Sequence, residues 1–186
     1  MSLQKEKQII TATIDCLTRS PGAPLEDIAQ HAGISRTTLF RYFPSREKLL
    51  QKIILEFDDQ IRTQLTPVLD EDISAIDMLN RIIEKTIRQN VQFNFLLYEP
   101  FVQQDPVNQS VINNALKLLQ RLIERLQQEG HISRHINIHW AAKALHMLIW
   151  GMGESVHDGD VAVNAAAQTL VETFLHGFCT VGENGG

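Results

Sequence analysis

A short segment in the first third of the chain concentrates side chains that carry positive charge or donate hydrogen bonds. The segment Arg36–Tyr42 holds two arginines, two threonines and a tyrosine, and Ser45 and Lys48 follow closely. Guanidinium groups pair with guanine or with phosphate, and threonine hydroxyls reach base edges or phosphate oxygens. A helix that begins after Ser45 also binds phosphate through its backbone amides. The candidate contacts to duplex DNA are therefore Arg36, Thr37, Thr38, Arg41, Tyr42, Ser45 and Lys48.

Several of these charges have plainer interpretations. Arg41 either contacts phosphate or pairs with Glu47, and Arg46 and Lys52 are either phosphate contacts or solvated surface charges. For the segment as a whole, the plain alternative is a helical hairpin that only packs. The polar and basic side chains share one outward face, which favours binding over packing alone.

The hydrophobic pattern around these residues predicts two short helices joined by a tight turn. Gly33 stands where a helix end needs a residue that tolerates positive φ, and Ser35 is placed to cap the next helix. The predicted helices are Leu25–Ala32 and Arg36–Phe43, with inward-facing side chains at Ile28, Ala29, Ala32, Ile34, Leu39, Phe40 and Phe43. This arrangement is a helix-turn-helix, and its second helix is short enough to lie in a major groove.

Helical periodicity dominates the rest of the chain. Ser45 is expected to cap a helix that begins at Arg46 and ends near Leu65, because Pro67 follows and proline stops a helix. The other predicted elements are helices at Leu3–Arg19, Ile73–Asn90, Asn108–Glu129, Ile138–Val156 and Val161–Phe178 and a short aromatic segment at Phe93–Val102. The predicted fold class is therefore all-α.

The charge of the chain is divided unevenly along its length. The net charge is −5 over 186 residues, which by itself argues against a nucleic-acid partner. Residues 1–52, however, hold eight basic and five acidic residues, a balance of +3, whereas the remainder holds nine and 17, a balance of −8. A basic first part on an acidic second part lets only the first part approach phosphates.

Composition also indicates where the protein resides. The two cysteines, Cys16 and Cys179, lie far apart and form no Cys-x-x-Cys pattern, so a disulfide framework is not expected. No apolar run precedes the first charges, as a signal peptide would require. The apolar stretch Trp140–Met152 is interrupted by Lys143 and is too short to span a bilayer. We therefore expect a soluble, cytoplasmic protein with no membrane partner.

The residues Gly33–Leu49 read Gly-Ile-Ser-Arg-Thr-Thr-Leu-Phe-Arg-Tyr-Phe-Pro-Ser-Arg-Glu-Lys-Leu. With the flanking residues 5–52, this sequence resembles the N-terminal domain of the TetR family of bacterial transcriptional regulators. The family often has tyrosine at the position of Phe40 and threonine where this chain has Ala23-Pro24-Leu25, so two hydroxyl contacts to phosphate are missing here. The resemblance implies an all-α homodimer, commonly a repressor that a small molecule releases from a near-palindromic operator.

From this resemblance follows a division of the chain. Residues 1–52 form a three-helix helix-turn-helix DNA-binding domain, and residues 53–181 form a helical-bundle domain for ligand sensing and dimerisation. Independently of the resemblance, we expect residues 182–186 to form a disordered tail. Two sets of residues in the second domain are candidates for its functions.

The first set combines aromatic and sulfur side chains with polar groups that could orient a ligand. Its members are Phe93, Tyr98, Glu99, Phe101, His146, Met147 and Trp150. Core packing is the alternative for each, and Glu99 either favours a cationic compound or is a surface acid. The second set lies on two helices rich in small residues, which suit a four-helix interface between subunits. Its members are Ala141, Ala144, Leu148, Gly151, Leu170, Phe174 and Phe178, and packing within one subunit is their alternative.

No residue pattern in the chain predicts catalysis or a metal site. His131, His135 and His139 recur every four residues, but Gly130 and Ser133 place this segment in a loop. No carboxylate cluster completes a metal site, and no nucleophile lies beside a base, so neither a cofactor nor an enzyme is expected. The alternatives to a DNA-binding regulator are a helical protein-interaction module and, less favoured, a small all-α enzyme. The expected partners are an operator duplex, a second copy of the chain and an unknown small-molecule effector.

Overall fold

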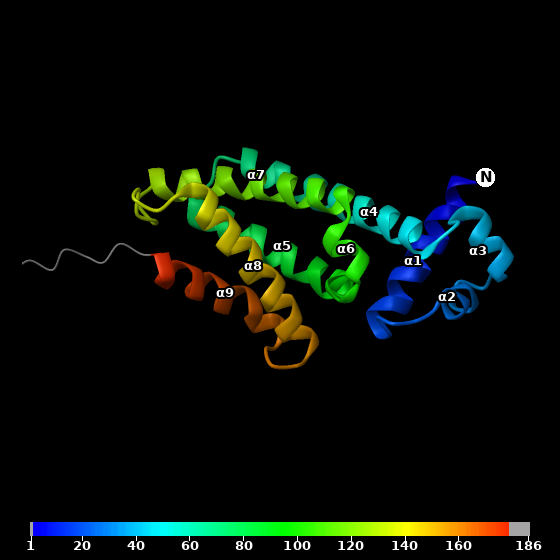
Figure 1. Cartoon of the computed structure of the whole chain (residues 1–186). Coiled ribbons are helices and arrows are strands. Elements are labelled where there is room, and N and C mark those ends of the chain that lie inside the picture. Colours follow the sequence, from blue (N-terminus) through cyan, green and yellow to red (C-terminus); the bar gives the residue numbers. More distant parts are fainter. Residues whose placement is uncertain (1, 179–186) are drawn as a thin grey trace, which may run out of the picture. The chain divides into compact units, whose positions relative to one another are not determined.

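The computed structural model describes residues 2–178, without the side chains of Leu97, Tyr98, Gln103 and Phe178 (Figure 1). The predicted tail at residues 182–186 lies outside this part of the chain. The described residues form helices joined by turns and contain no strand, which confirms the all-α class. The helices are α1 (Leu3–Arg19), α2 (Leu25–His31), α3 (Arg36–Tyr42), α4 (Arg46–Asp70), α5 (Ala75–Phe93), α6 (Pro100–Gln104), α7 (Pro106–Gln128), α8 (Ile138–His157) and α9 (Val163–Phe178), with a 3-10 helix η1 (Asn94–Tyr98) between α5 and α6.

The chain forms two compact units. Of the described residues, one unit consists of 2–60 together with 92–112, and we call it the head unit. The other consists of residues 61–91 and 113–178, and we call it the bundle unit. Residues 92–112 thus pack with the N-terminal helices, although the predicted boundary at residue 52 assigned them to the second domain. That boundary remains a prediction about which parts fold independently.

In the head unit, α1 packs against α2, and α2 against α3 (Figure 1). Helical spacing puts Ile10, Ile14 and Leu17 on one face of α1, and all three are buried. Ile28 of α2 and Leu39 of α3 are fully buried. The prediction that Phe40 is buried was wrong in degree, because its ring is half-buried and lies under the guanidinium of Arg36.

Cys16 also lies on the buried side of α1 and is a free thiol. Its residue is 9% exposed, and burial raises the pKa of the thiol. A protonated, buried thiol is a weak nucleophile, so this cysteine acts as a small apolar core residue.

The turn between α2 and α3 has the geometry that its sequence predicts. Gly33 has a φ of +65°, in the left-handed region that glycine adopts without strain. The Ile34 amide donates to the Ala29 carbonyl oxygen (3.0 Å), which satisfies the end of α2. The Ser35 hydroxyl accepts from the Thr38 amide (3.1 Å) and so caps α3.

The predicted end of α4 was wrong. The helix continues to Asp70 with Pro67 inside it, although proline removes one backbone hydrogen bond. Val68 and Leu69, which follow the proline, are 3% and 7% exposed. Burial of these two side chains keeps the last turn helical and offsets the missing hydrogen bond.

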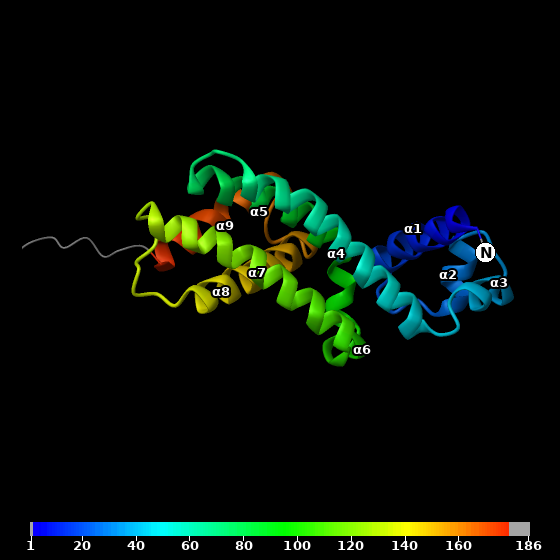
Figure 2. The same cartoon turned by 90° about the horizontal axis from the view of Figure 1, so that it is seen from above.

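In the bundle unit, α8 and α9 form a helical hairpin through a turn at residues 158–162, and the two helices lie side by side in Figures 1 and 2. The unit's core draws on α5 and α7, where Leu79, Ile83, Leu122 and Ile123 are fully buried. Helix α8 approaches α5 closely at Gly153, where a Cβ atom would stand 3.1 Å from that of Asn90. Of the helices in the described residues, none is long and apolar enough to cross a membrane.

Candidate nucleic-acid interface

Helix α3 has one buried face and one exposed polar face. Leu39 is fully buried, whereas Thr37 and Arg41 are exposed on the other side. Arg36 is exposed too, but its guanidinium pairs with Glu26 of α2 and lies 5.2 Å from the centre of the Phe40 ring. The exposed face of α3 thus carries cations and hydroxyls held close to the helix, as in the predicted recognition helix.

The remaining predicted contacts on α3 are partly engaged with their neighbours. The Thr38 hydroxyl lies 2.9 Å from the Ser35 hydroxyl and is half-buried. The Arg41 guanidinium lies 5.8 Å from the centre of the Tyr42 ring. This cation–π contact aligns a basic and a hydroxyl side chain at the end of the helix, where both can reach a phosphate.

The start of α4 provides the second predicted set. The Ser45 hydroxyl accepts from the Lys48 amide (3.3 Å), and the Lys48 ammonium donates to the Gln51 side chain (3.1 Å). A hydrogen bond with Ser45 lowers the pKa of Glu47, so this carboxyl stays ionised in the first turn. An ionised acid at this position opposes phosphate, and this effect was not anticipated from the sequence.

Helices α1 and α2 are joined by a charged cluster centred on Asp15. The Asp15 carboxylate contacts His31 of α2 (2.7 Å) and Arg19 of α1 (3.0 Å). The hydrogen bond with His31 lowers the pKa of Asp15. This cluster holds two helices of the head unit together on its exposed side.

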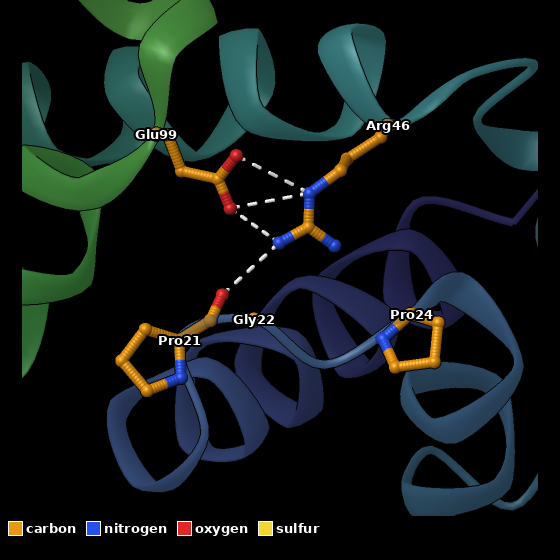
Figure 3. A pocket seen from close by; sticks show the side chains of 5 residues that line it. All are labelled: Pro21, Gly22, Pro24, Arg46 and Glu99. Carbon is orange, nitrogen blue, oxygen red and sulfur yellow. Dashed lines mark hydrogen bonds and ion pairs between the residues drawn. The ribbon is translucent and has the colours of Figure 1, made fainter.

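The most extensive polar contact of the head unit joins Arg46 to Glu99 (Figure 3). The Arg46 Nε donates to the two Glu99 carboxylate oxygens (3.1 and 3.3 Å), and Nη2 also donates to this carboxylate. The same guanidinium donates to the backbone carbonyl oxygens of Ala23 (2.6 Å) and Pro21 (3.1 Å). The ion pair lines a pocket of about 420 Å³ together with Pro21, Gly22 and Pro24.

This arrangement corrects two predictions. Arg46 is neither a solvated surface charge nor free to bind phosphate, because its side chain is 25% exposed and bonded to three residues. The Glu99 side chain is 11% exposed, and its carboxylate already has a cation in Arg46. A separation of 53 residues between the partners explains why no local pattern revealed the pair.

The predicted pocket residues fall in both units. In the head unit, Phe93 is fully buried and packs against Phe57, with ring centres 4.7 Å apart, so it belongs to the core. Phe101 is half-buried, and the Tyr98 side chain lies outside the described part of the structure. In the bundle unit, Met147 is 62% exposed, and the rings of His146 and Trp150 meet edge to face. Burial lowers the pKa of His146 to about 4, so this imidazole is neutral at pH 7.

The predicted interface residues divide into core and surface. Ala141, Leu170 and Phe174 are at most 1% exposed within one subunit, so the prediction that they meet a partner was wrong. Ala144 and Leu148 are half-buried, Gly151 is exposed, and the Phe178 side chain lies outside the described part. Trp140, which is not among the predicted interface residues, is 59% exposed on α8.

The histidines on either side of the turn before α8 have protein partners. His139 lies 2.8 Å from the Gln120 amide, and His131 lies 3.6 Å from the Glu129 carboxylate. Within residues 2–178, no three His, Cys, Asp or Glu side chains come together in a way that could hold a metal ion.

Comparison with known proteins places the helix-turn-helix in a family. Residues 9–53, which contain all of α2 and α3, match the family model of bacterial regulatory proteins, tetR family. These residues are a DNA-binding domain of the TetR type. The chain is a DNA-binding transcriptional regulator.

Two curated relatives and one solved structure show how far the likeness extends beyond these residues. The HTH-type transcriptional regulator NfxB of Pseudomonas aeruginosa is 25% identical over 178 residues, which cover 94% of this chain and 95% of that protein. The HTH-type transcriptional repressor LfrR of Mycolicibacterium smegmatis is 31% identical over 101 residues, 54% of this chain and 53% of the repressor. A crystal structure of LfrR in complex with proflavine, from Mycobacterium smegmatis, has the same fold, with a TM-score of 0.79, 21% identity and coverage of 96% and 99%.

Proposed function

We propose that this regulator is a TetR-family repressor that binds a near-palindromic operator as a homodimer and leaves it when a small molecule binds. The observation that carries the proposal is the two-sided character of α3. Its apolar face is buried against the head unit, and its exposed face presents Thr37 and Arg41. A short helix of this kind reads base edges in the major groove.

The contacts proposed for DNA divide into two kinds. The first kind, to base edges and adjacent phosphates, comes from four residues of α3: Arg36, Thr37, Thr38 and Arg41. To bind DNA, Arg36 would leave its ion pair with Glu26. Tyr42, Ser45 and Lys48 are assigned to phosphates, which set the register of the helix without reading sequence. In a dimer, two such helices would meet half-sites about 34–36 Å apart.

The dimer is supported by an apolar stripe along α8. Trp140, Ala144, Met147 and Gly151 follow one another at intervals of three or four residues, so they lie on one helix face. Trp140 and Met147 are 59% and 62% exposed in one subunit. Exposed apolar side chains in a row mark surfaces that other proteins cover, and we assign this stripe to a second copy of the chain.

The effector is proposed by analogy with LfrR, whose structure contains proflavine. Within the bundle unit, the half-buried His146 and Trp150 remain the candidates to contact it. Effector binding that weakens operator affinity 5- to 150-fold requires a coupling of roughly 1–3 kcal/mol. Proflavine is the first compound to test, with fluorescence quenching as the readout. A regulator that binds chromosomal DNA would act in the cytoplasm, and no catalytic activity is part of this proposal.

The test is selection of bound fragments from a pool of random duplexes, followed by titration of the selected sequence. We expect a palindromic consensus and an affinity that falls steeply with salt, since each phosphate contact releases counterions. A protein-interaction module would enrich no sequence and would show no such slope. An absence of enrichment at low ionic strength would refute the proposal.

A further inference from the structure

Three polar contacts within the head unit join residues 92–105 to the helices that carry the DNA-binding segment. The Thr18 hydroxyl of α1 donates to the Gln92 carbonyl oxygen (2.7 Å), and the Gln51 amide of α4 donates to Asp105 (2.7 Å). The third contact is the Arg46–Glu99 ion pair. Of the three, it alone pairs two charged side chains and also contacts the turn that leads into α2.

The Arg46 guanidinium connects three parts of the head unit at one point (Figure 3). It donates to Pro21 and Ala23 in the turn before α2, and to Glu99 between η1 and α6. Arg46 is itself the first residue of α4. Its side chain therefore fixes the start of α4, with the neighbouring Ser45 and Lys48, relative to the turn that precedes the helix-turn-helix.

Burial makes this pair different from a surface ion pair. The Arg46 and Glu99 side chains are 25% and 11% exposed, whereas the pair Arg81–Glu71 in the bundle unit is 49% and 41% exposed. A partly buried charge that loses its partner is strongly destabilising, because it cannot recover its hydration in place. The unpaired group can reach water only if the turn or the η1–α6 junction moves.

We infer that Arg46 and Glu99 are positioning residues for operator binding, which hold the turn before α2 and the start of α4 in the arrangement that duplex DNA requires. Neither side chain touches DNA in this scheme, and both act through Ser45, Lys48 and the helices that follow the turn. The inference rests on DNA binding by this chain and is independent of the effector and of the dimer.

Glu99→Gln gives the sharpest test, because a positioning role predicts weaker operator binding, whereas the loss of a negative charge alone predicts tighter binding. Removal of an acid from a DNA-binding unit reduces repulsion from phosphates, so charge alone predicts tighter binding to any duplex. Positioning predicts that the selected operator is bound about 5- to 150-fold more weakly, in the range of typical coupling between sites. Binding to a scrambled duplex of equal length should stay the same or tighten slightly. Fluorescence anisotropy on the two duplexes at one salt concentration measures both.

Arg46→Lys tests the same inference without any change of charge. A lysine ammonium lacks the planar fork that reaches Glu99 and two carbonyl oxygens at once, so operator affinity should fall while scrambled-duplex affinity does not. Glu71→Gln is the matched control, since it neutralises the acid of an ion pair in the bundle unit and should leave operator affinity unchanged. Circular dichroism and thermal unfolding verify that each variant is folded at the assay temperature.

The outcomes separate this inference from the proposed function. If the wild-type chain selects an operator but Glu99→Gln and Arg46→Lys bind it as tightly, the positioning assignment is wrong and DNA binding stands. If Glu99→Gln weakens binding to operator and scrambled duplex equally, the pair acts on stability alone, and the assignment is again overturned. If the wild-type chain selects no operator, the proposed function is wrong, and the positioning assignment that rests on it is wrong as well.

Discussion

At the scale of single residues, several side chains of the proposed DNA-binding surface already contact neighbours within the head unit. Arg36 pairs with Glu26, Arg41 lies against the Tyr42 ring, and Thr38 shares a hydrogen bond with Ser35. These contacts reduce the freedom that the side chains would lose on binding DNA, since an oriented group gives up less conformational entropy. The surface is therefore partly preorganised for a duplex.

The phosphate contacts give the prediction at this scale. Tyr42→Ala combined with Lys48→Ala should weaken binding to every duplex by a similar factor, because phosphates carry no sequence information. The slope of log affinity against log salt should become shallower by about 0.9 for the lost lysine contact. Anisotropy titrations between about 50 and 200 mM salt measure the slope. An unchanged operator affinity would show that these two side chains face solvent in the complex.

Residue types were predictable where the relevant partner is near in sequence. Ser35 and Ser45 cap their helices, and Gly33 takes a positive φ, because each depends on residues within one turn. The pairing of Arg46 with Glu99 depends on the tertiary fold, and no spacing rule connects residues so far apart. The same reason explains why the sequence offered Glu99 as a counter-ion for a ligand.

At the scale of helices, the positions of proline, glycine and serine, which end or cap helices, predicted most helix boundaries well. Helix α1 spans Leu3–Arg19, as predicted, because Pro21 and Gly22 follow it. Helix α4 passed through Pro67 because burial of Val68 and Leu69 outweighed a local signal. The extent of α8 was predicted, but its buried face was not. Small and apolar residues occur all round this helix, so the pattern does not indicate which face meets the core.

The exposed face of α8 carries the prediction at this scale. Met147→Glu places a charge in the proposed contact between subunits, where a buried unpaired carboxylate is costly. Because Met147 is 62% exposed in one subunit, the subunit itself should remain folded. We expect analytical ultracentrifugation to show a dimer for the wild type and a shift toward monomer for the variant. Leu55→Glu, at a residue 48% exposed on α4, is the control and should remain dimeric.

At the scale of the whole molecule, one half-buried histidine gives the stability a pH dependence of definite sign. The chain carries a net charge of −5, with a basic excess confined to the first 52 residues. The most strongly shifted group described is His146, whose pKa burial lowers to about 4.

The sign of the resulting pH dependence follows from this shift. In the unfolded chain, the histidine binds a proton below a pKa of about 6.5, whereas in the folded chain it stays neutral until about pH 4. Stability is thus fully present above pH 6.5 and is lost as the pH falls toward 4, by up to about 3 kcal/mol. His146→Phe keeps an aromatic ring beside Trp150. The free energy of unfolding of this variant, measured by urea denaturation, should change less with pH over this interval. If the unfolding free energy of the variant changes with pH as steeply as that of the wild type, the pH dependence comes from other groups.

The buried thiol of Cys16 gives the head unit a chemical reporter of its own opening. A disulfide reagent reacts with a thiolate that is in contact with solvent. In the packed head unit, Cys16 is buried and its raised pKa keeps the thiol protonated. Modification must wait for α1 to separate from its neighbours, so the rate of labelling measures how often that separation occurs. Any ligand that holds these helices together, DNA included, would slow the reaction in proportion to the openings it suppresses.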